Sequence, residues 1–278
     1  MTDDLLRREP ITRTQLIEQL ENLGVRPGGV LMLHCSLNSL GYVVGGADTI
    51  VTALIDLLGS SGTLVAMTGW EHDASGIDEW PTALQEAYGR DPPAFDPEVS
   101  ESAREYGRLP ERIRTWPGAR HSFHPECRFS AIGAQAEWIT KDQPWNHPYG
   151  PRSPLAKVVE AGGASLLLGA PLETLTVLHY AEELADVKDK KIVRYSAPLK
   201  TPLGIEWREV EDIDTANGAF PYDRVVGDRD SFEVIAEEAL TAGIGTSGRI
   251  GESKSHLFPA GELIRFAVDW IERHFSSD

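Results

Sequence analysis

The stretch at residues 30–67 reads VLMLHCSLNSLGYVVGGADTIVTALIDLLGSSGTLVAM. Its first four residues form a continuous apolar run, which is typical of a buried strand. Residues 47–58 carry apolar side chains at helical spacing, with Asp48 as the expected N-cap. Residues 62–67 then return to a strand pattern. A strand, a loop, a helix and a second strand in this order predict an α/β fold with a largely parallel or mixed central sheet covered by helices.

The rest of the chain extends this pattern, apart from one interruption. Between about residues 70 and 120, prolines and acids break the periodicity, which predicts an irregular acidic insertion that faces the substrate as a flap. We expect one domain over residues 1–278 that contains this insertion. Further elements are expected as a helix capped by Thr12 or Thr14, strands at 129–132 and 165–168, a hairpin at 192–210, and helices at 154–160, 174–185, 232–240 and 261–274.

The composition indicates a folded globular protein. Of the 278 residues, 41% are hydrophobic and 25% are charged. No apolar run approaches ~18 residues, so no transmembrane helix is expected. Residues 1–14 lack the apolar core of a secretory signal, which makes a cytoplasmic location the expectation. The two cysteines, Cys35 and Cys127, are too few for a disulfide framework or a multi-cysteine zinc site.

Acidic residues dominate the charge and gather in two stretches. The net charge is −17, which makes nucleic acid and anionic membranes poor partners. Residues 71–105 and 209–238 each hold ten acids against two arginines, so together they carry −16 of this charge. They are either solvated surface that keeps the protein soluble or a site that attracts a polycation. For the second case, we expect Asp73 and Asp96 at the mouth of the site.

His179 is a candidate catalytic residue. It lies in the helical run TVLHYAEELADV at 176–187, with Glu182 and Glu183 three and four residues further on. A helical histidine beside acids is most often a surface or core residue. However, this helix follows the strand at 165–168, and α/β sheets bind ligands beyond the carboxyl ends of their strands.

The loop after the first strand is a candidate phosphate site. It consists of His34, Cys35, Ser36, Leu37, Asn38, Ser39, Leu40 and Gly41. Backbone N–H groups and small hydroxyls at a strand end can bind phosphate or pyrophosphate. The loop matches neither the P-loop nor G-x-G-x-x-G, which disfavours nucleotide hydrolysis and Rossmann-type hydride transfer. We expect Cys35 to be a small buried residue rather than a nucleophile.

Two further groups of residues carry side chains that can form a site. The histidines lack metal-binding spacings such as H-E-x-x-H, so we expect no metal at His121, His124, His147 or His256. The segment EDIDT at 211–215 places three acids in four positions. Such a cluster suits the orientation of an imidazole or the reception of an amine, although an acidic turn is the simpler interpretation.

Four ordered blocks together resemble the aminoglycoside 3-N-acetyltransferase family. They are LMLHCSLNSLGYVVGGADTIVTALIDLLGSSGTLV, HSFHPECRFSAIG, GPRSPLAKVVEAGGASLLLGAPLETLTVLHYAEELADV and EDIDTANGAF. The third block is the most specific. Members of this family are antibiotic acetyltransferases that use acetyl-coenzyme A without the common GNAT fold.

The resemblance implies roles for individual residues. It makes His179 the general base and places the coenzyme A phosphates at residues 36–41, within the loop that begins at His34. The EDIDT segment would orient His179, with Asp214 as the first choice and Glu211 as the second. Relatives frequently carry a basic residue in place of Asn38, so phosphate binding here would depend more on backbone N–H groups.

The resemblance also implies the substrates. Glu173 and Thr215 join the two flap aspartates as expected substrate-binding residues, and acetyl-coenzyme A is the expected cosubstrate. Aminoglycosides are polyamines, which suits a chain with two strongly acidic stretches. The resemblance predicts direct acetylation of the 3-amino group by a histidine base, which confers resistance. Two alternatives stay open: an acetyltransferase of the same fold for another amine, and a non-catalytic polycation binder. The oligomeric state is not predicted.

Overall fold

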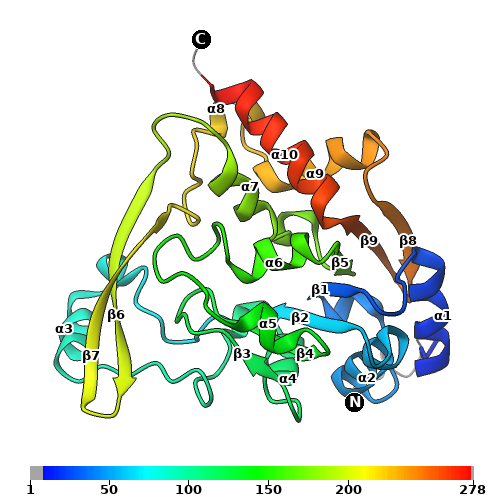
Figure 1. Ribbon diagram of the computed structural model, residues 1–278, viewed down its shortest axis with the longest axis horizontal. Coiled ribbons are helices and arrows are strands. Elements are labelled where there is room, and N and C mark those ends of the chain that lie inside the picture. Colours follow the sequence, from blue (N-terminus) through cyan, green and yellow to red (C-terminus); the bar gives the residue numbers. More distant parts are fainter. Residues whose placement is uncertain (1–8, 277–278) are drawn as a thin grey trace.

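A seven-stranded sheet forms the centre of the computed structural model, which describes residues 9–276 (Figure 1). Its strands are β1 (Val30–Cys35), β2 (Thr63–Met67), β3 (Arg120–His121), β4 (Phe129–Gly133), β5 (Ala164–Leu168), β8 (Thr246–Ile250) and β9 (Ser253–Pro259). They follow the order β3-β4-β2-β1-β5-β9-β8. The central strands β2, β1 and β5 are parallel, and the strands at both edges are antiparallel. The predicted mixed α/β sheet is therefore confirmed.

Helices cover both faces of this sheet (Figure 1). One face packs against α1 (Arg13–Leu23), α2 (Gly46–Leu58) and α4 (Arg108–Arg114). The other packs against α5 (Ala136–Thr140), α6 (Pro154–Glu160), α7 (Leu178–Leu184), α9 (Ser231–Thr241) and α10 (Ala260–Phe275). In β1, Val30 and Met32 enter one core while Leu31 and Leu33 enter the other, as strand alternation requires. Both cores therefore meet at β1, the first strand of the stretch at residues 30–67.

The helix starts follow the expected chemistry at α1 but not at α2. Thr12 caps α1 in a capping box with Gln15. The expected cap of α2, Asp48, instead lies inside its first turn, and Gly45 is the N-cap with φ 84°. A positive φ suits glycine, so the tight entry from the preceding loop selects Gly45 over a side-chain cap.

The insertion at 70–120 is less irregular than its prolines suggested. It contains α3 (Thr82–Arg90), α4 and two short 3-10 turns, η3 (Ile77–Glu79) and η4 (Arg104–Tyr106). Pro81 is the N-cap of α3, and Pro110 lies in the first turn of α4. At these positions proline removes no intrahelical hydrogen bond. These two prolines therefore lie where helices begin.

The predicted hairpin is confirmed as a separate two-stranded sheet of β6 (Ile192–Thr201) and β7 (Gly204–Ile213). It stands beside the insertion at the left of Figure 1. Phe95 of the insertion bridges to Leu199 of β6, and both belong to a small core with Trp70. After the hairpin, a short helix, α8 (Asp223–Val226), leads to α9.

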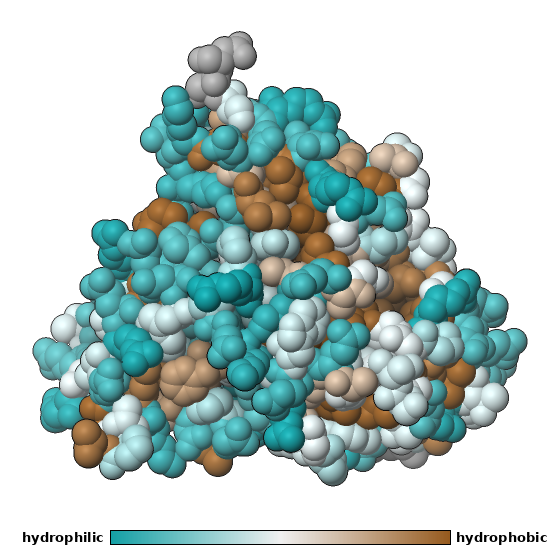
Figure 2. Space-filling view, in the orientation of Figure 1, coloured by the Kyte–Doolittle hydropathy of each residue, from teal (hydrophilic) through white to brown (hydrophobic). Residues whose placement is uncertain are grey.

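The surface fits the acidic composition. Hydrophilic side chains cover most of the face shown in Figure 2, and apolar side chains gather between them, most broadly in the upper centre of the view. Within residues 9–276, no helix is long and apolar enough to cross a membrane. The expectation that no secretory signal is present concerns residues 1–14, of which 1–8 lie outside the described residues.

Candidate active site

A pocket with a volume of about 520 Å³ lies beyond the carboxyl ends of β1 and β5. The end of β1, the insertion, the segment after β5 and helices α7 and α9 all contribute to it. Its polar lining residues are His34, Cys35, Ser36, Asn38, Glu105, Tyr106, Arg108, Glu173, Thr174, Thr176 and His179. The structure therefore brings His179 and the first half of the predicted phosphate loop to one cavity, where α/β sheets commonly bind ligands.

His179 forms a pair with Glu182, and both residues belong to α7. Its Nδ1 lies 2.7 Å from Oε2 of Glu182, one helical turn further on. The His179 side chain is 17% exposed and that of Glu182 only 2%. Because a carboxylate only accepts hydrogen bonds, Glu182 holds the proton on Nδ1 and leaves Nε2 with its lone pair. The pair can therefore act as an oriented base.

Aromatic side chains hold this pair in place. Tyr222 donates a hydrogen bond from its hydroxyl to the second oxygen of Glu182 at 2.8 Å. Burial and the adjacent Glu182 raise the pKa of Tyr222 far above its ordinary value, so this hydroxyl stays protonated. The rings of Tyr149 and Phe232 lie 4.8 Å from the imidazole of His179, centroid to centroid. Both the orientation and the tilt of the ring are thus fixed.

The predicted partner of His179 is corrected by this geometry. Asp214 accepts hydrogen bonds from the backbone and side-chain nitrogens of Asn217, at 2.9 and 3.3 Å. Glu211 pairs with Arg194 across the hairpin, and that contact lowers the pKa of Glu211. Both acids lie at or just past the end of β7 and are occupied there. Glu182 instead forms the hydrogen bond to His179 that was expected of Asp214 or Glu211. It can do so because residues at i and i+3 share one face of a helix.

The predicted phosphate loop divides into a half that lines the pocket and a half that does not. After Ser36, residues 37–40 form a 3-10 turn, η2 (Leu37–Leu40). Residues 34–38 line the pocket, whereas Ser39, Leu40 and Gly41 do not. Ser39 instead donates its hydroxyl to the carbonyls of Ser36 and Gly169, at 2.8 and 2.7 Å. The second half therefore ties the loop to the end of β5.

Two ionisable groups at the end of β1 are held neutral. Burial lowers the pKa of His34 to about 4 and raises the pKa of the Cys35 thiol to about 12. Nε2 of His34 is buried and has no hydrogen-bond partner within residues 9–276. At neutral pH this side of the pocket thus offers an uncharged imidazole and an intact thiol, as expected for a non-nucleophilic Cys35.

Of the four predicted substrate-binding residues, Glu173 lines the pocket, and Asp73, Asp96 and Thr215 do not. Asp96 forms an ion pair with Lys200 of the hairpin at 2.9 Å, a contact that lowers its pKa. Asp73 accepts a hydrogen bond from the backbone of Ser75 at 2.9 Å. The part of the insertion that reaches the pocket is residues 105–110 instead.

The pocket also contains residues that the sequence did not single out. Arg108 is the one lysine or arginine among its lining residues, and it comes from the start of α4. No sequence signal distinguishes it from the other arginines of the insertion. Glu182, by contrast, had a signal, since it lies three residues after His179 in a helical run.

These features define an α/β enzyme with a carboxylate-oriented imidazole in a pocket at the sheet's parallel strand ends. A family model described as aminoglycoside 3-N-acetyltransferase matches residues 32–272. The chain belongs to this transferase family. It is 44% identical to aminoglycoside N(3)-acetyltransferase IX of Micromonospora chalcea, covering 95% of this chain and 94% of that protein. It is 46% identical to aminoglycoside N(3)-acetyltransferase VIII of Streptomyces fradiae, covering 95% and 92%.

Solved structures agree with this assignment. The crystal structure of aminoglycoside acetyltransferase AAC(3)-Xa matches with a TM-score of 0.94 at 43% identity, covering 99% of this chain and 98% of that one. A binary complex of AAC-IIIb with CoASH matches with a TM-score of 0.88 at 40% identity, covering 97% and 99%. AAC-VIa bound to sisomicin matches with a TM-score of 0.88 at 33% identity, covering 97% and 100%.

Proposed function

We propose that the protein acetylates the 3-amino group of aminoglycoside antibiotics with acetyl-coenzyme A, and so confers resistance. The observation that carries this proposal is the His179–Glu182 pair, which lines the same pocket as the strand end at residues 34–38. Membership of the family supports it, as do related structures whose descriptions name CoASH and sisomicin.

In this mechanism the acetyl group passes directly to the amine. Nε2 of His179 takes a proton from the substrate nitrogen as that nitrogen attacks the thioester carbonyl carbon. The C–N bond forms, the C–S bond breaks, and the departing thiolate takes up a proton. Glu182 stabilises the imidazolium that exists between these two proton transfers. An acyl-enzyme has little support, because Cys35, the pocket's cysteine, keeps its proton at neutral pH.

Coenzyme A is assigned to the side of the pocket formed by the end of β1 and the start of α4. Asn38, which carries no charge, lines this side, and Arg108 lines the same pocket. An exposed guanidinium matches the phosphate groups of coenzyme A in charge and in hydrogen-bond geometry. Arg108 therefore supplies from α4 the positive charge that position 38 lacks.

The amine substrate is assigned to the acidic part of the pocket. Glu105 and Glu173 line it together with His179. Their carboxylates suit the ammonium groups of an aminoglycoside, and the chain's net charge of −17 attracts such a polycation from a distance.

A coenzyme A release assay with a panel of amines tests the proposal. The panel contains aminoglycosides with a free 3-amino group, the same compounds blocked at that nitrogen, and simple polyamines. Turnover is expected with the first set, and NMR of the product should place the acetyl group on the 3-amino nitrogen. Equal turnover with the blocked compounds or the polyamines would indicate another amine acetyltransferase. Binding without coenzyme A release would indicate a non-catalytic binder.

A further inference from the structure

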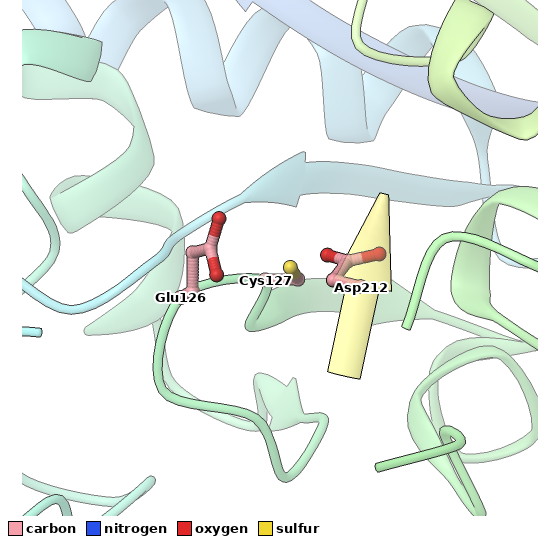
Figure 3. Close-up of side chains that lie close together, drawn as sticks. All are labelled: Glu126, Cys127 and Asp212. Atoms are coloured by element: carbon pink, nitrogen blue, oxygen red, sulfur yellow. The ribbon is translucent and has the colours of Figure 1, made fainter. Parts of the chain in front are cut away.

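Glu126, Cys127 and Asp212 form a cluster that is separate from the residues lining the pocket. Glu126 and Cys127 immediately precede the strand β4, and Asp212 lies near the end of β7. One ligand atom from each lies within 4.8 Å of the other two. In Figure 3 the sulfur of Cys127 lies between the two carboxylates. Two chain segments about 85 residues apart thus place a thiol and two acids together.

Each of the two acids in the cluster accepts a hydrogen bond at one of its carboxylate oxygens. Oδ1 of Asp212 accepts a hydrogen bond from the backbone of Ile213 at 2.8 Å. Oδ2 is buried without a partner in the described part of the chain, and the Asp212 residue is only 1% exposed. Oε2 of Glu126 accepts a hydrogen bond from the Tyr195 hydroxyl. A buried carboxylate oxygen without a donor is costly, so Oδ2 of Asp212 marks the place of a missing positive partner.

The neighbouring charges strengthen this conclusion. The charged side chains that act on Asp212 are Glu126, Glu183 and Glu182, and all three are acids. A second group, His147 with Glu183, also comes within 4.8 Å of Asp212. His147 itself is engaged by Glu183 at 3.1 Å and faces Glu211 at 3.5 Å. Acids therefore predominate around Asp212, since the nearby His147 is already engaged by Glu183.

We propose that Glu126, Cys127 and Asp212 bind a thiophilic divalent cation of the Zn²⁺ type. Metal–ligand bonds to sulfur and oxygen are about 2.0–2.3 Å, so small side-chain rotations bring all three atoms onto one ion. A substrate ammonium would use the two carboxylates but gain nothing from a fully buried thiol. On binding, the ion displaces the proton of Cys127 to solvent and makes a metal–thiolate bond, with no change of oxidation state.

The site would act on the base through Tyr149. Tyr149 acts on the thiol of Cys127, and its ring packs against His179. An ion at the cluster would therefore fix the hairpin end to the strand β4 and stiffen the platform beneath the imidazole. This role is structural, and it does not depend on which amine the enzyme acetylates.

Cobalt titration of the full-length chain, after treatment with EDTA, tests this site. Co²⁺ should produce a thiolate-to-metal charge-transfer band with a stoichiometry of one ion per chain, and Zn²⁺ should displace it. Cys127→Ser should abolish the band, and Asp212→Asn should weaken Co²⁺ binding at least about tenfold. Cys35→Ser is the matched control, because it removes the other thiol and should leave the band intact. Circular dichroism establishes that the variants are folded.

The outcomes separate this proposal from the proposed function, since the titration contains neither acetyl-coenzyme A nor an aminoglycoside. A wild-type protein without the band overturns the site, as does a band that persists in folded Cys127→Ser. If Cys127→Ser does not fold, loss of affinity in Asp212→Asn decides the question. Weaker aminoglycoside binding by Asp212→Asn, with no Co²⁺ band in the wild type, would assign the cluster to a substrate ammonium instead.

Discussion

Two imidazoles line the pocket in different surroundings. His179, on α7, has a buried carboxylate on Nδ1, whereas Nε2 of His34, at the end of β1, is buried without a partner. Burial alone acts on His34 and lowers its pKa to about 4. The same residue type thus has a hydrogen-bonded partner that orients it on one side of the pocket and none at its buried nitrogen on the other. The difference comes from Glu182, which holds the proton on Nδ1 of His179 and leaves Nε2 with its lone pair.

Removal of the partnered imidazole should have the largest effect. His179→Ala is expected to lower kcat by roughly 10²–10⁴, the usual range for loss of a general base, with little change in coenzyme A binding. Steady-state kinetics and calorimetry measure the two quantities. His121→Gln, which alters a histidine outside the pocket, is the control. A kcat close to wild type in His179→Ala would remove the distinction between the two imidazoles.

Loss of the carboxylate should make His179 behave more like His34. Glu182→Gln is expected to lower kcat about tenfold to a hundredfold, because a hydrogen bond to a charged group contributes ~1.5–3 kcal/mol. The loss should appear in kcat, because the imidazole would no longer be held in one orientation. Asp214→Asn is the comparison, and steady-state kinetics are the measurement. A larger loss in Asp214→Asn would restore the partner that the sequence suggested.

These two acids show what could and could not be predicted from the sequence. The unit of β1, α2 and β2 was predictable because its periodicity is local, and the position of His179 after a buried strand indicated the pocket that it lines. The partner was not, because the distance between Asp214 and His179 depends on where the hairpin ends in space. Glu182 lies only one helical turn from His179, yet the denser acids at 211–215 drew the prediction away from it.

Other differences have a similar cause. Pairing direction at the sheet edges depends on tertiary contacts, so the antiparallel pairing of β4 was not predicted. The strands β8 and β9 were not predicted at all. Within the insertion, the sequence does not indicate which part returns to the pocket. Residues 105–110 do so, whereas Asp96 pairs with the hairpin.

The unpartnered imidazole should reveal itself through stability rather than catalysis. Since the folded-state pKa of His34 is about 4, below its ordinary 6.5, the unfolded chain binds a proton more readily in this range. Stability therefore falls as pH decreases from about 6.5 towards 4, by on the order of 3 kcal/mol. His34→Asn should lessen this fall. Thermal unfolding of both proteins at several pH values is the measurement, and parallel curves would contradict the assignment.

Loss of the positive charge of Arg108 should weaken binding of the cosubstrate moderately. Arg108→Gln is expected to raise KM for acetyl-coenzyme A roughly threefold to tenfold, since an exposed charged contact contributes about 1 kcal/mol. The KM for the aminoglycoside should change little. Arg112→Gln is the matched control, because Arg112 lies one turn further along α4 and pairs with Asp48. Equal effects in the two variants would indicate a general charge effect instead of a phosphate contact.

The smallest expected effect separates the acids inside the pocket from those outside it. Neutralising Asp73 and Asp96 together should lower kcat/KM for an aminoglycoside at most twofold to threefold at low salt, because Lys200 already compensates Asp96. At ~0.15 M salt the Debye length is about 8 Å, so this long-range contribution should vanish. Glu105→Gln with Glu173→Gln should instead retain part of its defect, since direct contacts in the pocket are screened less. Rates measured across a salt series distinguish the two double variants. If their curves coincide, the pocket carboxylates do not contact the substrate, and the acidic residues act only through the overall charge.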